Sequence, residues 1–330
     1  MGSRLCKMRS AFLTLLAASL TIAIMPRQAD AADLVKVGTA IPGSFSFMPL
    51  NIGQEVGIFQ NDGIDVQIIG FSGGTKMHQA LAANTLDVGF GSGPQMILTA
   101  KGSPMMAVAE MARAPANVIM IVPYNSPIKT LDDLDGKKIG VSGLTSLSAF
   151  TAREMTRGKD GSASKIQLVA IGGTESAVVS ALRTGQVDAI TYDLLPGLQL
   201  EKVKEARIVA NAADYIPHFI THAIYAQNDI MANRPDVLKR FLAGWFQTIA
   251  FMKANKETTI KLTSKISGSS EEFQELEYDK FMPAFFSPDG HFAPEDVAGV
   301  AESLKVIEGT DSAPDLSKLY TEKFLPTSGG

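Results

Sequence analysis

Short loops rich in glycine, serine and threonine are the parts of this sequence best suited to bind a ligand. Five of them, at 43–47, 73–75, 91–93, 142–148 and 172–174, follow strand-like segments and precede helix-like ones. The first N–H groups of a helix have no acceptor within the helix, and hydroxyl side chains there add further hydrogen-bond partners. Such loops are expected to hold a polar or anionic group.

The candidate ligand-binding residues share this position between a strand and a helix. They are Ser44, Phe45, Ser46, Phe47, Gly74, Thr75, Ser92, Gly93, Thr145, Ser146, Ser148, Gly173, Thr174, Tyr192 and Asp193. Each serine or threonine has a structural alternative, because these residues commonly cap helix N-termini. The hypothesis of a site gains weight if two halves of the chain point such loops at one cleft.

The aromatic and acidic candidates each leave two interpretations open. Phe45 and Phe47 would either line a site for an apolar or aromatic ligand or fasten their loop to the core. Asp193 would either accept a hydrogen bond from a ligand amine or hydroxyl or cap the following turn. If Asp193 faces the ligand, a strongly anionic solute is disfavoured.

Patterns for nucleotide binding, metal binding and catalysis are missing from the sequence. It contains neither G-x-x-x-x-G-K-[ST] nor H-E-x-x-H, and no G-x-G-x-x-G follows the first strand. His218 and His222 lie four residues apart in a strand-like stretch, which separates them by ~13 Å, too far for one metal ion. We therefore predict no cofactor, no metal and no catalytic residue.

The first 31 residues resemble an export signal. Arg4, Lys7 and Arg9 precede an apolar run over 11–25, and the small-x-small pattern of a cleavage site ends at Ala31. We predict a cleaved signal peptide at 1–31, with an uncleaved anchor as the alternative. The only cysteine, Cys6, would leave with this segment, and so the remaining chain would have no thiol and no lipid anchor.

The charge balance argues against nucleic acid as a partner. The full sequence has 30 basic and 34 acidic residues, a net charge of −4. Residues 1–31 hold four basic residues and one acidic residue, so the remaining chain would carry −7. A surface this acidic repels phosphate backbones.

Alternating strands and helices predict an α/β fold with doubly wound, mostly parallel sheets. Strands are expected at 34–40, 64–71 and 86–90, with helices from residue 49 and from the loop at 72–75. A further helix after residue 233 carries its aromatic residues at helical spacing. We interpret that stripe as core packing.

The same pattern begins again about one hundred residues later. Residues 137–140 match 35–38 at an offset of 102, and 187–189 match 86–88 at an offset of 101. We predict two lobes on one βαβαβ plan, or convergence on the same layout. Strands at 118–124 and 221–227 would form a two-stranded hinge. The first lobe would then comprise 32–124 and 221–330, and the second 125–220.

Four stretches resemble a known family. PLNIGQEVGIFQNDGIDVQII (49–69), ALAANTLDVGFGSG (80–93), TLDDLDGKKIGV (130–141) and ALRTGQVDAI (181–190) are similar to ABC-importer solute receptors of the sulfonate, taurine and nitrate type. Receptors for a thiamine pyrimidine precursor belong to the same group. The resemblance implies a two-lobed periplasmic-binding-protein fold (type II-like), with the ligand between the lobes.

The resemblance also indicates which loops contribute to the site. They match 43–47, 73–75, 92–94 and 145–148, and the last often reads Gly-Ser where this chain has Thr145-Ser146. That difference puts an anion-binding role of this loop in doubt. The related pyrimidine synthases use a cysteine-rich motif that is absent from this sequence.

The sequence therefore predicts a monomeric periplasmic receptor that closes over a small solute and delivers it to an ABC transporter permease. Sulfonates, carboxylates or similar anions are favoured as ligands, and an aromatic or heterocyclic solute is the alternative. A secreted lyase- or decarboxylase-like enzyme on the same fold is the rival function. A cytoplasmic effector-sensing domain is a second rival, which the export signal opposes.

Overall fold

The computed structural model describes residues 32–157, 165–308 and 310–326. The predicted signal peptide, its cleavage site and Cys6 lie outside these residues. No helix in the described ranges is both long and apolar enough to cross a membrane.

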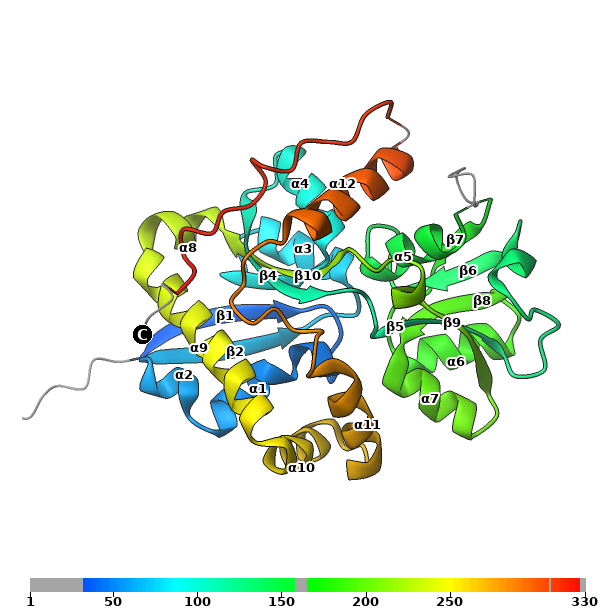
Figure 1. Ribbon diagram of the computed structural model, residues 1–330, viewed down its shortest axis with the longest axis horizontal. Helices are drawn as coiled ribbons and strands as arrows, with labels where there is room; N and C mark the ends of the chain where they lie inside the picture. Colours follow the sequence, from blue (N-terminus) through cyan, green and yellow to red (C-terminus); the bar gives the residue numbers. More distant parts are fainter. Residues whose placement is uncertain (1–31, 158–164, 309, 327–330) are drawn as a thin grey trace, which may run out of the picture. The chain divides into compact units, whose positions relative to one another are not determined.

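Two five-stranded sheets form the frame of the structure (Figure 1). The first has the order β2-β1-β3-β10-β4 and the second has the order β7-β6-β8-β5-β9. The strands of the first sheet are β1 (Asp33–Thr39), β2 (Ile64–Gly70), β3 (Val88–Gly91), β4 (Met105–Arg113) and β10 (Ile220–Gln227). Those of the second are β5 (Val118–Pro123), β6 (Lys138–Val141), β7 (Gln167–Ala170), β8 (Ala189–Asp193) and β9 (Ala206–Asn211).

Helices connect and cover the strands, which confirms the predicted α/β class. Along the first sheet they are η1 (Phe45–Phe47), α1 (Met48–Glu55), α2 (Ile58–Asn61), α3 (Gly74–Ala82), η2 (Gly93–Gln95) and α4 (Met96–Ala100). Along the second they are η3 (Leu131–Leu134), α5 (Leu147–Met155), α6 (Glu175–Arg183), α7 (Leu194–Lys202) and η4 (Ala212–Asp214). The chain then continues through α8 (Asn228–Asn233), α9 (Pro235–Ala254), α10 (Lys256–Ser267), α11 (Glu271–Phe281) and α12 (Pro294–Glu308).

The two sheets share the same strand arrangement, and the similarity extends to one hydrogen bond to an aspartate side chain. Four strands of each sheet run in one direction, and the fourth strand in the order, β10 or β5, is antiparallel to both of its neighbours. In the first sheet the Lys36 N–H donates to Asp87 Oδ2 at 2.7 Å, and in the second the Lys138 N–H donates to Asp188 Oδ2 at 2.8 Å. These pairs are the matching positions of the repeat found in the sequence.

The strand pairing bears on the boundary between the halves. The chain passes from the first sheet to the second at 114–117 and returns at 212–219. The prediction gave 118–124 to the first lobe as a hinge strand, but β5 is hydrogen-bonded between β8 and β9 of the second sheet. The predicted lobe limits remain a prediction, and this pairing favours a first crossing at 114–117. We call 32–113 with 220–326 the first half, and 118–211 the second half.

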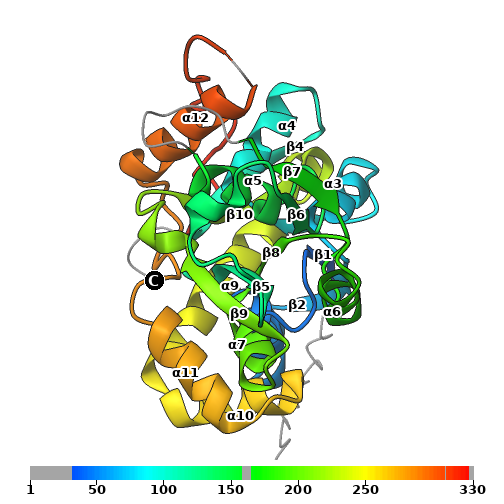
Figure 2. The same cartoon turned by 90° about the vertical axis from the view of Figure 1, so that its right-hand side faces the viewer.

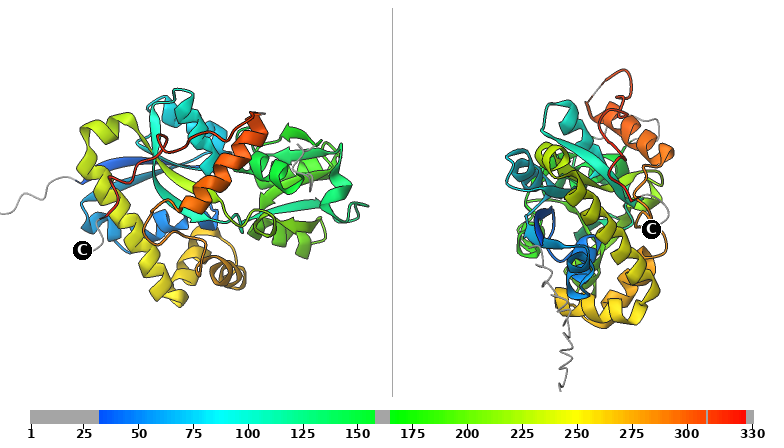
Figure 3. Two further views of the ribbon diagram at one scale, coloured as in Figure 1. Left: turned by 45° about the horizontal axis from the view of Figure 1, so that its top comes forward. Right: turned by 90° about the vertical axis from the view of Figure 1, so that its left-hand side faces the viewer.

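The long helix α9 packs against the first sheet through the predicted apolar stripe (Figures 1 and 3). Its residues Leu238, Phe241, Leu242, Trp245, Phe246, Ile249 and Met252 are all buried, which confirms core packing. The Trp245 ring meets Phe90 of β3 edge-on with the ring centroids 4.7 Å apart. Helices α10 and α11 extend this half toward α7 (Figure 2), where Gln199 Nε2 donates to Ser269 Oγ at 3.0 Å.

Replacing Trp245 by alanine is expected to lower the free energy of unfolding by about 3–5 kcal/mol, because a fully buried indole leaves a cavity. Equilibrium unfolding in urea measures this change. Leu276→Ala, on a side chain that is 53% exposed, should stay within about 0.5 kcal/mol of the wild type. Equal effects of the two variants would contradict the assignment of α9 to the core.

Candidate ligand-binding site

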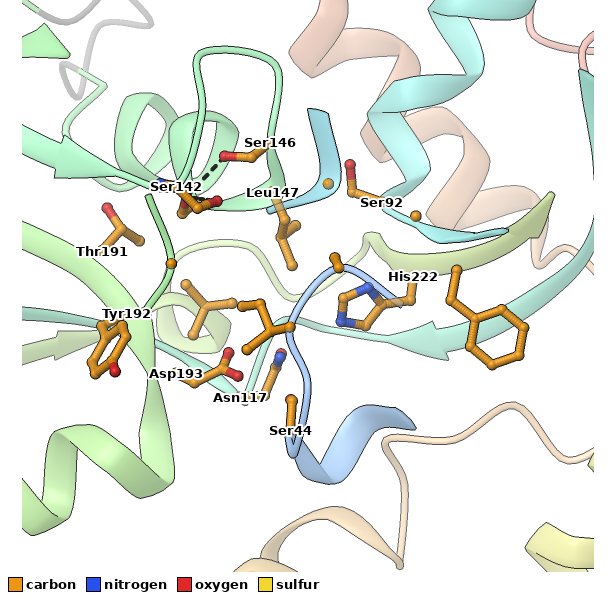
Figure 4. A pocket seen from close by; sticks show the side chains of 18 of the residues that line it. Ser44, Ser92, Asn117, Ser142, Ser146, Leu147, Thr191, Tyr192, Asp193 and His222 are labelled. Atoms are coloured by element: carbon orange, nitrogen blue, oxygen red, sulfur yellow. Dashed lines mark hydrogen bonds between the residues drawn. The ribbon is translucent and has the colours of Figure 1, made fainter. Parts of the chain in front are cut away.

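A cavity of about 50 Å³ is lined by residues of both halves, beyond the carboxyl ends of the parallel strands (Figure 4). From the first half it receives Ala40, Ile41, Ser44, Phe47, Gly74, Phe90, Gly91, Ser92, Gln95 and His222. The second half contributes Val118, Ser142, Ser146, Leu147, Ser148, Gly172, Gly173, Val178, Ile190, Thr191, Tyr192 and Asp193, and the first crossing contributes Asn117. We call this the inner cavity.

A second hollow, of about 430 Å³, adjoins the inner cavity. The two share Ile41, Ser44, Gly173, Tyr192 and Asp193. Glu175 and Gln199 of the second half and Ser267, Ser269 and Glu277 of the first half also line it. We call it the outer cavity.

Nine of the fifteen candidates from the sequence line the inner cavity. They are Ser44, Phe47, Gly74, Ser92, Ser146, Ser148, Gly173, Tyr192 and Asp193. The other six, Phe45, Ser46, Thr75, Gly93, Thr145 and Thr174, do not line it. Contact between any of these residues and a ligand stays a prediction.

In the loop at 43–47, one phenylalanine packs into the core and the other lines the inner cavity. Phe45 packs against Phe281 and Phe286, with ring centroids 5.7 and 6.1 Å apart, and so it fastens the loop to the core. Ser46 Oγ accepts a hydrogen bond from Asn117 Nδ2 at 3.3 Å. Phe47 lines the inner cavity and meets the His222 ring edge-on at 5.2 Å.

Thr75 and Thr145 connect the two halves directly. Their hydroxyl oxygens lie 2.8 Å apart, and Gln95 Nε2 donates to the Thr145 carbonyl oxygen at 3.1 Å. A side chain at Gly93 would not fit, since a Cβ there would lie 2.4 Å from the Ile220 carbonyl oxygen. These residues bring segments together rather than face the inner cavity.

The hydroxyl groups of the second-half loops are largely used by the protein itself. Ser146 caps α5 by accepting from the Ala149 N–H and donates to the Gly143 carbonyl oxygen at 2.6 Å. Ser148 Oγ accepts from the Ser142 N–H at 3.0 Å (Figure 4). Thr174 accepts from the Ala177 N–H as the N-cap of α6. The structural alternative therefore accounts for much of this loop chemistry.

Four buried polar side chains of the inner cavity are different, and sequence reasoning selected only Ser92 among them. Ser92, Asn117, Thr191 and His222 are 3%, 4%, 3% and 5% exposed. Within the described residues Ser92 Oγ, Asn117 Oδ1, Thr191 Oγ1 and both His222 ring nitrogens have no hydrogen-bond partner. Leaving such a group unpaired costs about 1–3 kcal/mol. The position of the other three, next to β5 or within β8 or β10, was the available signal, but β5 and β10 had been interpreted as hinge strands.

The two cavities have no cationic side chain among their lining residues. Neither a lysine nor an arginine lines the inner or the outer cavity. Burial lowers the pKa of His222 to about 4, and so the ring is neutral at pH 7. Desolvation, not a nearby charge, is the main cause.

Two carboxyl groups that line these cavities have raised pKa values. Burial raises the pKa of Asp193 to about 6, and the Ser44 hydroxyl opposes this shift. Burial raises the pKa of Glu277 to about 8, with the charge of Asp193 adding to the effect and Gln274 opposing it. The two acids therefore interact across the outer cavity, Asp193 from the second half and Glu277 from the first.

Residues 44–259 match the family model described as NMT1/THI5 like, which covers more than half of the chain. The chain belongs to the NMT1/THI5-like family. The matched range begins in the first loop of the cavity and includes all of the second sheet.

Relatives of this NMT1/THI5-like protein are named for binding. A Brucella abortus protein whose name describes it as a binding protein is 29% identical over 256 residues, which cover 76% of this chain and 77% of that protein. The formylaminopyrimidine-binding protein of Halalkalibacterium halodurans is 21% identical over 79% of this chain and 81% of its own.

A solved structure shows the same fold. The alkanesulfonate-binding protein SsuA of Xanthomonas axonopodis pv. citri superposes with a TM-score of 0.71 at 16% identity, covering 87% of this chain and 96% of that one. This confirms the predicted periplasmic-binding-protein fold for the NMT1/THI5-like chain.

Glu277→Gln should stabilise the protein more at high pH than at low pH. Because the folded pKa is about 8 and an unfolded glutamate titrates near ~4.3, wild-type stability is lost as pH rises between these values. Glutamine cannot titrate and avoids this loss. We expect little change at about pH 4 and a gain on the order of 1–3 kcal/mol at about pH 9, measured by urea unfolding.

The matched control is Glu271→Gln, which removes an exposed carboxylate from the first turn of the same helix. It should show no gain that grows with pH. A gain for Glu277→Gln that is the same at both pH values would contradict the assigned pKa.

Proposed function

We propose that this chain is the solute-binding receptor of an ABC importer, acting outside the cytoplasm. It holds a small organic solute between its halves and delivers it to a membrane permease. The observation that carries this proposal is a set of four buried, unpartnered polar side chains around one cavity, namely Ser92, Asn117, Thr191 and His222. A solute that hydrogen-bonds to them removes the cost of leaving them unpaired.

Closure of the halves over the solute is the mechanism we infer. Within the described residues the chain crosses between the sheets at two segments, 114–117 and 212–219, and a hydrogen bond from the Ala114 N–H to the Phe219 carbonyl oxygen links them at 3.0 Å. A solute that contacts both halves binds the closed form better than the open one and so shifts the population toward it. The pair Thr75–Thr145 adds a direct contact in the closed form.

The family supports the receptor function. The reported relatives are named as binding proteins, and the fold is that of SsuA. The export signal predicted at 1–31 agrees with a periplasmic location. The names of these relatives point to two solute classes, a sulfonate and an aminopyrimidine, which correspond to the anion and the heterocycle anticipated from the sequence.

An enzyme is the second candidate, because a specific observation favours it. Asp193 and Glu277 are two carboxyl groups with raised pKa values at one cavity, which an acid–base reaction on the bound solute would use. Mass spectrometry of the solute after long incubation with the protein separates the two functions. A receptor returns the solute unchanged, whereas an enzyme returns a product.

Thr191→Val should weaken solute binding without destabilising the empty protein. A thermal-shift screen of sulfonates, carboxylates, amines and amino-heterocycles first identifies a solute, which at ~100 times its Kd adds about 2.7 kcal/mol to folding stability. Valine keeps the shape of Thr191 but removes a hydroxyl that has no partner within the described residues. We expect about a fivefold rise in Kd by calorimetry, because one neutral hydrogen bond contributes ~1 kcal/mol.

The control is Thr248→Val, whose hydroxyl donates to the Gly244 carbonyl oxygen inside α9 at 2.8 Å. This variant should lose about 1 kcal/mol of stability and keep the wild-type Kd. If Thr191→Val keeps its affinity as well, or if no solute shifts the melting temperature, the receptor site is not where we place it.

A further inference from the structure

Two acidic side chains from opposite halves face the same space. Asp193 ends β8 and lines both cavities, while Glu277 lies on α11 and lines the outer cavity. Glu277 is 5% exposed, and Asp193 is half-buried. Neither forms an ion pair within the described residues, where Gln274 Nε2 donates to Glu277 Oε2 at 3.4 Å.

This arrangement is unfavourable in the empty protein. Buried carboxylates are ordinarily paired with a cation, because removing a charge from water is costly. Here burial and the charge of Asp193 raise the pKa of Glu277 to about 8, so that at neutral pH Glu277 is largely protonated in the empty protein. A positive charge between the two acids would stabilise both in their ionised forms, whereas a negative solute would add a like charge beside Asp193.

The inner cavity favours the same ligand chemistry on independent grounds. Asn117 Oδ1 can only accept a hydrogen bond, and it has no donor within the described residues. His222 is neutral and supplies no charge for an anion. Figure 4 shows Asp193, Asn117 and Ser44 at the same side of the cavity. A ligand group with several N–H donors fits these acceptors.

The remaining walls are suited to a compact apolar body. Ile41, Phe47, Phe90, Leu147, Val178 and Ile190 line the inner cavity. Burial of apolar surface against these walls adds to the affinity. The charged end would then face Asp193 and the outer cavity.

We propose that the solute is a small organic cation, in which a protonated nitrogen bound by Asp193 and balanced by Glu277 is joined to a compact apolar body. This inference rests on the proposed receptor function and names its substrate class. It departs from the anion that the strand-to-helix loops suggested.

Ring-matched probes test the charge of the solute. Benzamidine, benzamide and benzoate have nearly the same shape and carry charges of about +1, 0 and −1 at neutral pH. Butylamine, butyramide and butyrate form an aliphatic set of the same kind. By calorimetry and thermal shift, the better of the two cations should bind about tenfold or more tightly than its neutral partner, because hydrogen bonds to charged groups are the stronger ones. The anions should not bind.

Asp193→Asn keeps the shape of the side chain and removes its charge. This variant should lose about tenfold or more of the affinity for the cation. Asp132→Asn, which removes an exposed carboxylate from η3 of the same half, should leave the affinity unchanged.

The outcomes of these binding experiments separate the cation inference from the receptor function. Binding of a neutral or anionic probe as tight as that of its cationic partner, or full affinity in Asp193→Asn, overturns the cation inference and leaves the receptor function standing. Failure of both cations also counts against the inference. If no probe binds, and no compound in a metabolite extract of the cells that make the protein binds, the result counts against the receptor function itself.

Discussion

The insertion of the second half into the first is the constraint on which the structure depends. The second sheet is built from five consecutive strands, β5 to β9, whereas β10 completes the first sheet only after the chain has passed through the second half. The first half therefore needs segments from both sides of the second half to complete its sheet. Because both crossings lie at the same edge, the carboxyl ends of the parallel strands in the two sheets come to face a common cavity.

The chemistry of the cavity follows from this placement. Loops that end the parallel strands deliver small and hydroxyl-bearing residues, as their sequences indicate. The two antiparallel strands next to the crossings deliver further polar groups, with Asn117 immediately before β5 and His222 within β10. An interior that leaves Asn117 Oδ1 and Thr191 Oγ1 unpaired is built for an occupant rather than for maximal stability of the empty protein.

Much of the fold could be predicted from the sequence, because its signals are local. Alternating strands and helices, the apolar stripe of α9 and the repeat that pairs Lys36 with Asp87 and Lys138 with Asp188 all depend on residues close together in the chain or at matching positions. The sheet that contains β5 could not be predicted in this way, since an apolar strand next to a crossing fits either side. Pairing with β8 and β9 decides it.

The candidate site was predictable at the level of loops and less so at the level of side chains. Glycine and serine spacing locates the loops, but Ser146 and Thr174 turn out to cap helices, and Phe45 packs into the core. The interaction of Asp193 with Glu277 joins the end of a strand in one half to a helix in the other, which no local pattern contains.

Asn117 occupies a special place, because it belongs to the crossing as well as to the cavity. Its backbone carbonyl oxygen accepts from the Leu194 N–H, its Nδ2 donates to Ser46 of the first half, and its side chain lines the cavity, with Oδ1 unpartnered within the described residues. A solute that hydrogen-bonds to Oδ1 thus contacts the first crossing directly. A molecule of similar size that cannot reach this atom would bind without stabilising the closed form. Selection between solutes would therefore occur when the halves close rather than at initial binding.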